Sequence, residues 1–319
     1  MRLATIDLGS NTVRLLVADV EQGRAGWRAV DEAQTVTRLG EGVGATGRLA
    51  AAAMARTQTV VADYVARAHR AGAARIDVVA TSAMREASNG RQFAAALERA
   101  TGVAVRVIGG EEEARLTVRG ALHGLDPVDG PTVVFDIGGG STEYVLTWAG
   151  APAAATSLRL GVVPLAERYP FVGPVDPERY GGLTAEVGAQ LARELPAAIR
   201  STRGARLVGT AGTVTTLGAL DLALDTYDPA RVHGHRLPRR AVAALLTRLG
   251  ALTVGERAAL PCLEPGRADL IVAGIAIVAE TMACLEVPEL VVSDHGVREG
   301  LLLEACAPGP RFDSVPGDV

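Results

Sequence analysis

Three observations predict an α/β protein built from two lobes. The chain has 319 residues, which at roughly 100 to 200 residues per domain is enough for two domains with a core each. Short apolar segments typical of strands alternate with longer helical segments. One strand–turn–strand pattern occurs twice, as DLGSNTVR at residues 7–14 and as DIGGGSTE at residues 136–143. We therefore expect lobes at residues 1–125 and 126–306, each beginning with one copy of the pattern, and a cleft between them.

The first lobe is expected to begin with two antiparallel strands, because a glycine-containing turn separates apolar residues 3–6 from apolar residues 12–20. The rest of this lobe alternates between helix and strand. We expect helices at 50–71, 91–100 and 111–121, and strands at 76–80 and 103–108.

The second lobe is expected to repeat the opening hairpin, with strands at 132–135 and 143–148. It follows HGLDPVDGP, residues 123–131, a turn-rich stretch suited to a domain boundary. Helices near 184–201, 270–279 and 297–305 and strands at 206–209 and 289–293 complete the lobe. Residues 307–319 are rich in Pro, Gly and Asp, so this tail is expected to be disordered.

Composition excludes several kinds of function. All 32 basic residues are Arg, so neither a lysine-dependent P-loop nor a lysine Schiff base can form. The net charge of -4 argues against general nucleic-acid binding, which needs a positive surface. No secretory signal is recognised, and the longest apolar run falls short of the ~20 residues of a membrane span. Cys262, Cys284 and Cys306 are too few and too far apart for a disulfide framework, so we expect buried, reduced thiols and a cytoplasmic location.

The repeated turns have the composition of a phosphate-binding site, because backbone N–H groups can converge on a phosphate only where side chains are small. The residues concerned are Gly9, Ser10 and Asn11 in the first turn and Gly138, Gly139, Gly140, Ser141 and Thr142 in the second. Asp7 and Asp136 end the preceding strands and would point into one cleft, where a carboxylate repels a phosphate. A Mg²⁺ ion, or Mn²⁺ in its place, resolves that conflict. The alternative is a plain glycine turn in each hairpin, an explanation that two matching copies weaken.

The two turns resemble the phosphate-binding loops of the actin, sugar kinase and Hsp70 superfamily. Further motifs narrow the resemblance: TSAMREASN at 81–89, GGEEEARL at 109–116, GTAGTVTTL at 209–217 and DHGVREG at 294–300. Together with DIGGGSTE they occur in the order and spacing of the exopolyphosphatase and guanosine pentaphosphate phosphohydrolase (Ppx/GppA) family, over roughly residues 3–305. The resemblance implies two actin-like (ribonuclease H-like) lobes with mixed sheets flanked by helices.

The resemblance also implies roles for charged residues. Members of the family hydrolyse a terminal phosphoanhydride, and Glu113 falls on the position of their proposed general base, which accepts a proton from the attacking water. Glu143 matches a second acidic position, which shares water activation or holds the metal ion. Arg14 and Arg85 match family arginines suited to bidentate phosphate contacts. The alternative for both arginines is an ordinary exposed or ion-paired side chain.

Other polar residues carry weaker signals. Glu111 and Glu112 are assigned to a helix amino terminus, where acidic side chains are favoured. Gly212 and Thr213 resemble a phosphate-facing turn at a helix start, with a plain helix cap as the alternative. The HGH stretch at 233–235 lacks a third zinc ligand, so loop structure or phosphate contact is favoured over a metal site. Six further arginines are candidates to line a polyanion groove, although surface exposure is the expectation for any one: Arg231, Arg236, Arg239, Arg240, Arg267 and Arg298.

The resulting expectation is a Mg²⁺-dependent exopolyphosphatase that releases orthophosphate, with a guanosine pentaphosphate 5'-phosphohydrolase as the main alternative. A small-molecule kinase is disfavoured because SDHGVREG stands where such kinases carry a Gly-Gly adenosine-binding segment. A non-catalytic sensor is disfavoured by the presence of Glu113 and Glu143. Longer relatives carry an additional carboxy-terminal helical region that contributes to polyphosphate binding, so a preference for short chains is expected here. A homodimer would extend the groove.

Overall fold

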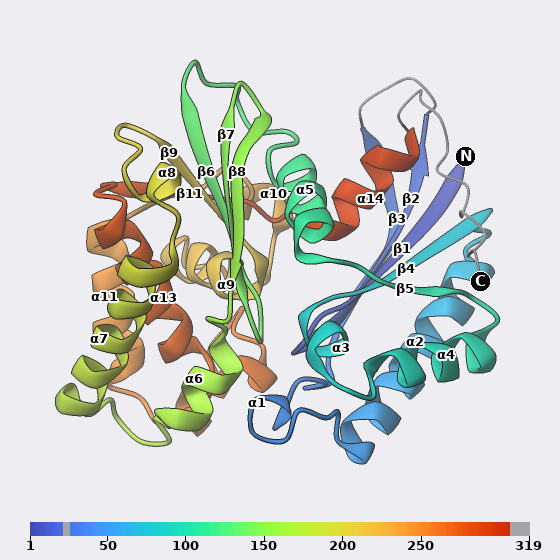
Figure 1. Cartoon of the computed structure of the whole chain (residues 1–319), viewed down its shortest axis with the longest axis horizontal. Coiled ribbons are helices and arrows are strands. Elements are labelled where there is room, and N and C mark those ends of the chain that lie inside the picture. Colours follow the sequence, from blue (N-terminus) through green and yellow to red (C-terminus); the bar gives the residue numbers. More distant parts are fainter. Residues whose placement is uncertain (22–25, 307–319) are drawn as a thin grey trace.

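Each half of the chain builds one mixed sheet in the computed structural model, which describes residues 1–21 and 26–306 (Figure 1). The first sheet has the order β3-β2-β1-β4-β5 and the second has the order β10-β11-β9-β6-β7-β8. The strands of the first sheet are β1 (Arg2–Leu8), β2 (Thr12–Val20), β3 (Trp27–Val36), β4 (Arg75–Ala80) and β5 (Val105–Val107). The strands of the second sheet are β6 (Pro131–Ile137), β7 (Thr142–Trp148), β8 (Ala151–Leu158), β9 (Arg206–Thr210), β10 (Arg236–Pro238) and β11 (Glu289–Val292).

The two sheets share the arrangement of four strands. β1 pairs antiparallel with β2 and parallel with β4, and β6 pairs in the same way with β7 and β9. β3 and β8 each extend the opening hairpin by one antiparallel strand. This repeated order confirms the predicted fold of two actin-like lobes.

Helices cover the sheets and contribute much of the two cores. In the first half of the chain they are α1 (Val43–Thr46), α2 (Ala51–Arg70), α3 (Ser82–Glu86), α4 (Gly90–Thr101) and α5 (Gly110–Ala121). In the second half they are α6 (Val162–Arg168), α7 (Pro177–Glu194), α8 (Ala197–Arg200), α9 (Ala211–Asp221), α10 (Pro229–Val232), α11 (Arg239–Gly250), α12 (Val254–Ala258), the 3-10 helix η1 (Pro265–Arg267), α13 (Ile271–Cys284) and α14 (Val297–Cys306). Both cores consist mainly of Ala, Val, Leu and Ile, as expected for a chain with 3% aromatic residues.

Two helices, α5 and α14, lie between the lobes, and each packs on the sheet of the other half of the chain (Figure 1). α5 packs against Val134 of the second sheet, and α14 packs against Leu3 of the first. The backbones of the two helices approach closely, since a Cβ atom at Gly300 would lie 2.1 Å from the carbonyl oxygen of Leu116. The division of the chain at residues 125 and 126 stays a prediction, and packing crosses it at both helices.

Some local expectations were wrong. The helix expected at 184–201 is α7 followed by a separate α8, because Pro196 between them has no N–H to continue the helix. Strands β3 and β8 were not expected, because both lie at or near a sheet edge and expose many of their residues, which removes the apolar pattern. Cys262 and Cys284 are only half-buried, although all three cysteines are free.

Two further expectations concern the chain ends and the membrane. Residues 307–319, expected to be a disordered tail, lie outside the described residues. Within residues 1–21 and 26–306, none of the helices combines the length and hydropathy needed to span a bilayer.

Candidate active site

The two glycine turns have the same hydrogen-bonding geometry. In the first turn the amide of Gly9 donates to the carbonyl oxygen of Thr12 at 3.1 Å. In the second turn the amide of Gly138 donates to the carbonyl oxygen of Ser141 at 2.9 Å. In each turn the donating glycine follows the aspartate by two positions and the accepting residue follows it by five. The repeated sequence pattern therefore corresponds to a repeated structure.

Residues that flank the turns are equivalent as well. Asp7 lies opposite Arg14 in the first hairpin, and Asp136 lies opposite Glu143 in the second. The duplicated hairpin therefore presents two carboxylates in one lobe and a carboxylate with a guanidinium in the other.

The turns meet across the lobes. A Cβ atom at Gly139 would lie 2.9 Å from Cβ of Ser10 and 3.0 Å from the backbone nitrogen of Asn11. A Cβ atom at Gly140 would lie 2.7 Å from Oγ of Ser82. Glycine is therefore required at these positions for the two turns to approach each other as they do.

A cavity of about 90 Å³ opens between the turns and collects most of the predicted site residues. Those that line it are Asp7, Gly9, Ser10, Asn11, Arg14, Glu113, Asp136, Gly138, Gly139, Ser141, Glu143, Gly212 and Thr213. Its wall also contains Thr12, Thr81, Ser82, Ile137, Val162, Ala211, Arg267, Leu270, Ile271 and Val297. Thr81 and Ser82 begin the TSAMREASN motif, so the sequence could have identified them as site residues. The apolar lining residues belong to no such motif and could not have been identified in this way.

Asp7 and Asp136 face the cavity where few groups can stabilise their charge. Oδ1 of Asp7 is buried and has no hydrogen-bond partner among the described residues. Oδ2 of Asp136 accepts only a long hydrogen bond, at 3.4 Å, from Oγ1 of Thr117. Burial raises the pKa of Asp7 to about 6 and that of Asp136 to about 7, with the charge of Glu143 adding to the second shift.

These two carboxylates fit a hard cation better than they fit protein partners. No cluster of three or more His, Cys, Asp or Glu side chains suited to a metal ion occurs in the part of the chain that the structure describes. A Mg²⁺ ion held by Asp7 and Asp136 would complete its shell with water and substrate oxygens, as this ion commonly does.

Glu113 and Glu143 form a second acidic pair in the same cavity. Glu143 is 2% exposed, and its Oε1 accepts hydrogen bonds from the hydroxyls of Ser141 at 2.7 Å and Ser157 at 2.6 Å. Glu113 is 6% exposed, and its Oε2 accepts a hydrogen bond from Arg85 at 2.8 Å. Burial raises the pKa of both carboxyl groups, and the charge of Glu143 raises the pKa of Glu113 further. A carboxylate whose pKa is raised toward neutrality is suited to proton transfer.

The two predicted phosphate-binding arginines differ in their surroundings. Nη1 of Arg85 donates to Glu113 and to the carbonyl oxygen of Ile108 at 3.1 Å, and Arg85 is not among the residues that line the cavity. Arg14 lines the cavity, and its side chain forms no hydrogen bond or ion pair within residues 1–21 and 26–306. The guanidinium of Arg14 is therefore free to receive a ligand, whereas Arg85 contacts the site through Glu113.

The amino terminus of α9 also opens on the cavity. Its N-cap, Thr210, makes no side-chain capping bond, and the hydroxyl of Thr210 donates instead to the carbonyl oxygen of His295 at 2.6 Å. Gly212 and Thr213 lie in the first turn of α9, and their role as phosphate ligands stays a prediction. Gly212 also makes room for Arg267, since a Cβ atom there would lie 2.5 Å from the central guanidinium carbon.

A second cavity of about 470 Å³ adjoins the first, since Arg14, Ala211 and Arg267 line both. Arg267 is 8% exposed and bridges the lobes by donating to Oε1 of Gln34 at 3.1 Å. It also forms an ion pair with Glu264 at 3.3 Å. Burial lowers the pKa of Arg267 to about 10, which leaves it charged at neutral pH.

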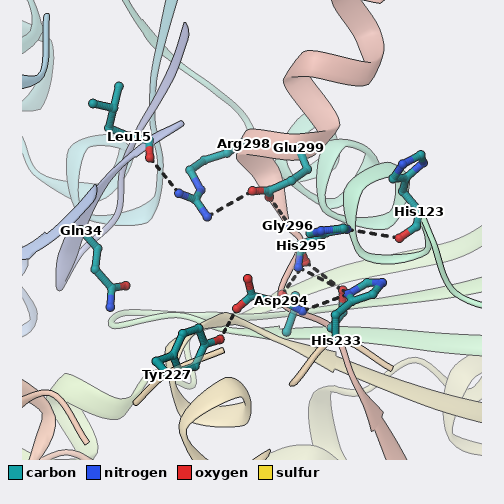
Figure 2. A network of polar contacts seen from close by, with 12 residues as sticks. Leu15, Gln34, His123, Tyr227, His233, Asp294, His295, Gly296, Arg298 and Glu299 are labelled. Atoms are coloured by element: carbon teal, nitrogen blue, oxygen red, sulfur yellow. Dashed lines mark hydrogen bonds and ion pairs between the residues drawn. The ribbon is translucent and has the colours of Figure 1, made fainter. Parts of the chain in front are cut away.

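Figure 2 shows the loop between β11 and α14, which forms part of the wall of the second cavity. Arg298 donates to the carbonyl oxygen of Leu15 at 3.0 Å and pairs with Glu299 at 3.1 Å. Asp294 accepts a hydrogen bond from the hydroxyl of Tyr227. The second cavity therefore combines arginine side chains with an aromatic ring and carboxylates.

Several predicted residues are not among those that line the two cavities. Gly140 and Thr142 do not line the first, and the hydroxyl of Thr142 donates to the carbonyl oxygen of Leu160, so their role as phosphate ligands stays a prediction. Nδ1 of His233 accepts from the amide of Asp294 at 3.3 Å, which agrees with the loop role favoured for the HGH stretch. Of the six candidate arginines, two line a cavity, Arg267 and Arg298, and four line neither, Arg231, Arg236, Arg239 and Arg240.

Two glycine turns, paired carboxylates and the amino terminus of α9 meet in one cavity between two lobes of the actin-like class, an arrangement suited to a phosphate ligand. Residues 16–307 match the model of the Ppx/GppA phosphatase family, and the chain belongs to that family. The predicted class of enzyme, a hydrolase of phosphoanhydrides, is thereby confirmed.

Individual relatives cover nearly the whole chain. Exopolyphosphatase 2 of Mycobacterium tuberculosis is 38% identical over 316 residues, which cover 95% of this chain and 98% of that protein. The crystal structure of the Aquifex aeolicus Ppx/GppA family member is 32% identical with a TM-score of 0.79, over 96% of this chain and 97% of the other. An exopolyphosphatase from Cytophaga hutchinsonii, 24% identical, matches in fold with a TM-score of 0.88 over 96% of this chain and 98% of that one.

Proposed function

We propose that the protein is a Mg²⁺-dependent exopolyphosphatase that removes the terminal phosphate of short inorganic polyphosphate chains. The observation that carries the proposal is the meeting of Glu113 and Glu143 with Asp7 and Asp136 in one cavity between the phosphate turns. Hydrolysis of a terminal phosphoanhydride needs a base for water, a cation for the phosphate oxygens and N–H donors around them. The chain supplies residues suited to each of these tasks.

In the proposed reaction, the terminal phosphoryl group lies between the two turns, whose small residues let backbone N–H groups approach its oxygens. Glu113 accepts a proton from the attacking water, the water oxygen bonds to the terminal phosphorus, and the bridging P–O bond breaks. The products are orthophosphate and a chain one unit shorter. Mg²⁺ or Mn²⁺ at Asp7 and Asp136 would neutralise charge on the transferred oxygens. Glu143 is held by two hydroxyls, which suits it to orient water or a hydrated metal ion rather than to move.

The remaining part of the substrate is assigned to the second cavity. Arg14 and Arg267 line both cavities, so a polyanion leaving the first passes two guanidinium groups. Three carboxylates also line the second cavity, Glu32, Glu264 and Asp294. They limit the length over which the wall attracts a polyphosphate, which supports the preference for short chains.

The second candidate is guanosine pentaphosphate 5'-phosphohydrolase. The observation that favours it is Tyr227, which lines the second cavity and is 38% exposed, because an aromatic ring can stack on a base. The homodimer and the cytoplasmic location stay predictions.

The test is phosphate release from tripolyphosphate, from polyphosphate on the order of hundreds of units long, and from guanosine pentaphosphate, each with Mg²⁺, with Mn²⁺ and with EDTA. Fastest release from the short chain, abolished by EDTA, is the expected result. Equal or faster release from long chains would contradict the length preference, and release from guanosine pentaphosphate alone would select the second candidate.

A further inference from the structure

An ion pair crosses the cleft close to the first phosphate turn. Nη1 and Nη2 of Arg38 donate to Oδ2 and Oδ1 of Asp269, both at 2.9 Å. Nη2 of Arg38 also donates to the carbonyl oxygen of Gly266 at 3.2 Å. Arg38 follows β3 in the first lobe, whereas Asp269 precedes α13 in the second, so the pair exists only while the lobes are together.

The pair lies at the end of the cleft away from α5 and α14. Shortly after Arg38, the amide of Gly42, which caps α1, donates to Oε1 of Glu167 in α6 at 3.3 Å. In Figure 1, α1 and α6 lie at the lower end of the gap between the lobes, and α5 and α14 lie at the upper end. Opening of the lobes about α5 and α14 would therefore separate Arg38 from Asp269.

The backbone of Arg38 holds the first phosphate turn. The amides of Thr37 and Arg38 donate to the carbonyl oxygen of Asn11 at 2.9 and 3.0 Å. The amide of Gly40 donates to the carbonyl oxygen of Ser10 at 2.7 Å. The peptide unit between Ser10 and Asn11 is planar and trans, so its C=O and N–H groups point in opposite directions. Fixing the carbonyl of Ser10 therefore also fixes the direction of the Asn11 N–H, which lies beside Gly139 of the second turn.

The conformation of Arg38 depends on these contacts. Its φ is 50°, in the left-handed region that a non-glycine residue adopts only when its surroundings hold it there. Its side chain is anchored to the second lobe, and its amide is bonded to the first turn. Loss of the side-chain anchor removes one of the constraints on the residue that shapes the turn.

We propose that Arg38 is a positioning residue that couples closure of the lobes to the shape of the first phosphate turn, with Asp269 as its partner in the closed state. The proposal rests on the proposed function for the role of the turn. The pair is about one-third exposed on both sides. It is therefore weak enough to break and reform during turnover, and salt weakens it.

The test is amide hydrogen exchange of residues 37–40 in Asp269→Asn, which removes the charge and keeps the shape. Exchange at these amides is expected to rise about fivefold or more, the lower end of usual coupling between sites. The matched control is Asp31→Asn, because Asp31 and Arg67 form a bidentate pair of similar exposure inside the first lobe. The control is expected to leave exchange at 37–40 unchanged.

The exchanged pair, Arg38→Asp with Asp269→Arg, restores the opposite charges and is expected to restore much of the protection. Three results would each overturn the proposal. They are unchanged exchange in Asp269→Asn, an equal rise of exchange in Asp31→Asn, and no recovery of protection in a folded protein with the exchanged pair. The kcat/KM for tripolyphosphate is expected to follow the protection of residues 37–40. Hydrogen exchange does not depend on turnover. A protein that releases no phosphate would therefore refute the proposed function, whereas the exchange result would still decide whether Arg38 has the proposed positioning role.

Discussion

The guanidinium of Arg85 donates a hydrogen bond at 2.8 Å to Oε2 of Glu113, so a predicted phosphate ligand is bound to the predicted base. The pair fixes the direction of the Glu113 carboxylate in a cavity where burial opposes its charge. Arg85 also opposes the rise in the pKa of Glu113 that burial causes. The variants Glu113→Gln and Arg85→Ala separate these roles.

Glu113→Gln keeps the shape of the side chain but cannot accept a proton. Turnover of tripolyphosphate is expected to fall by about 10²- to 10⁴-fold, the usual cost of losing a general base, with a small change in KM. Glu111→Gln, on the exposed side of α5, is the control and is expected to be near normal. Steady-state kinetics of both variants make the measurement. Near-normal turnover in Glu113→Gln would assign the base elsewhere, with Glu143 the first candidate.

Arg85→Ala removes the cation that favours ionised Glu113. The pKa of Glu113 is then expected to rise further, so the acidic limb of the kcat profile moves to higher pH. Arg85→Lys keeps the charge and is expected to shift the limb less. The measurement is kcat against pH for both variants, with Arg91→Ala on the exposed side of α4 as control. An unmoved limb in Arg85→Ala would show that the pair does not set the protonation of the base.

The residues of the phosphate turns could be predicted from the sequence because their constraint is local. Asp7 and Asp136 are the next-to-last residues of apolar strands, and small residues follow soon after both, so one pattern marks the end of each strand and the turn after it. The cavity confirms that the two copies lie together. The fold was predictable for the same reason, since a repeated hairpin implies a repeated sheet.

Contacts between distant residues could not be predicted. Arg38 and Asp269 are separated by 231 positions, and nothing local in either segment selects the other. The same holds for α5 and α14, because an apolar helix face shows that the helix is buried but not which sheet covers it. The packing of Arg267 against Gly212 depends on η1 approaching α9, which no periodicity in either element indicates.

Gly139→Ala is expected to hold the two turns apart. The added methyl group would lie 2.9 Å from Cβ of Ser10, and backbone on both sides leaves little room to move. We expect KM for tripolyphosphate to rise at least tenfold while the thermal midpoint changes little, because the contact crosses a cleft that can open. The control is Gly181→Ala at an exposed position of α7, where nothing lies near the new methyl and helix propensity favours alanine by about 0.5–1 kcal/mol. Unchanged KM in Gly139→Ala would mean that close approach of the turns is not needed for binding.

In EDTA, the protein is expected to lose stability as pH rises toward neutrality, because Asp136 is buried and its ionised form is disfavoured in the folded state. The folded pKa is about 7 and the ordinary value is 3.8, so between these values the unfolded chain ionises while the folded carboxyl stays protonated. The contribution is fully present below about pH 4 and is lost as pH rises through 7, on the order of a few kcal/mol. A Mg²⁺ ion held by Asp136 would bind the ionised carboxylate, so Mg²⁺ is expected to raise the thermal midpoint more at pH 8 than at pH 5. Asp136→Asn is expected to flatten the pH dependence in EDTA and to remove most of the Mg²⁺ effect, whereas Asp63→Asn at an exposed position of α2 should alter neither. Thermal unfolding of the three proteins at both pH values makes the measurement, and a Mg²⁺ shift that survives Asp136→Asn would place the cation elsewhere.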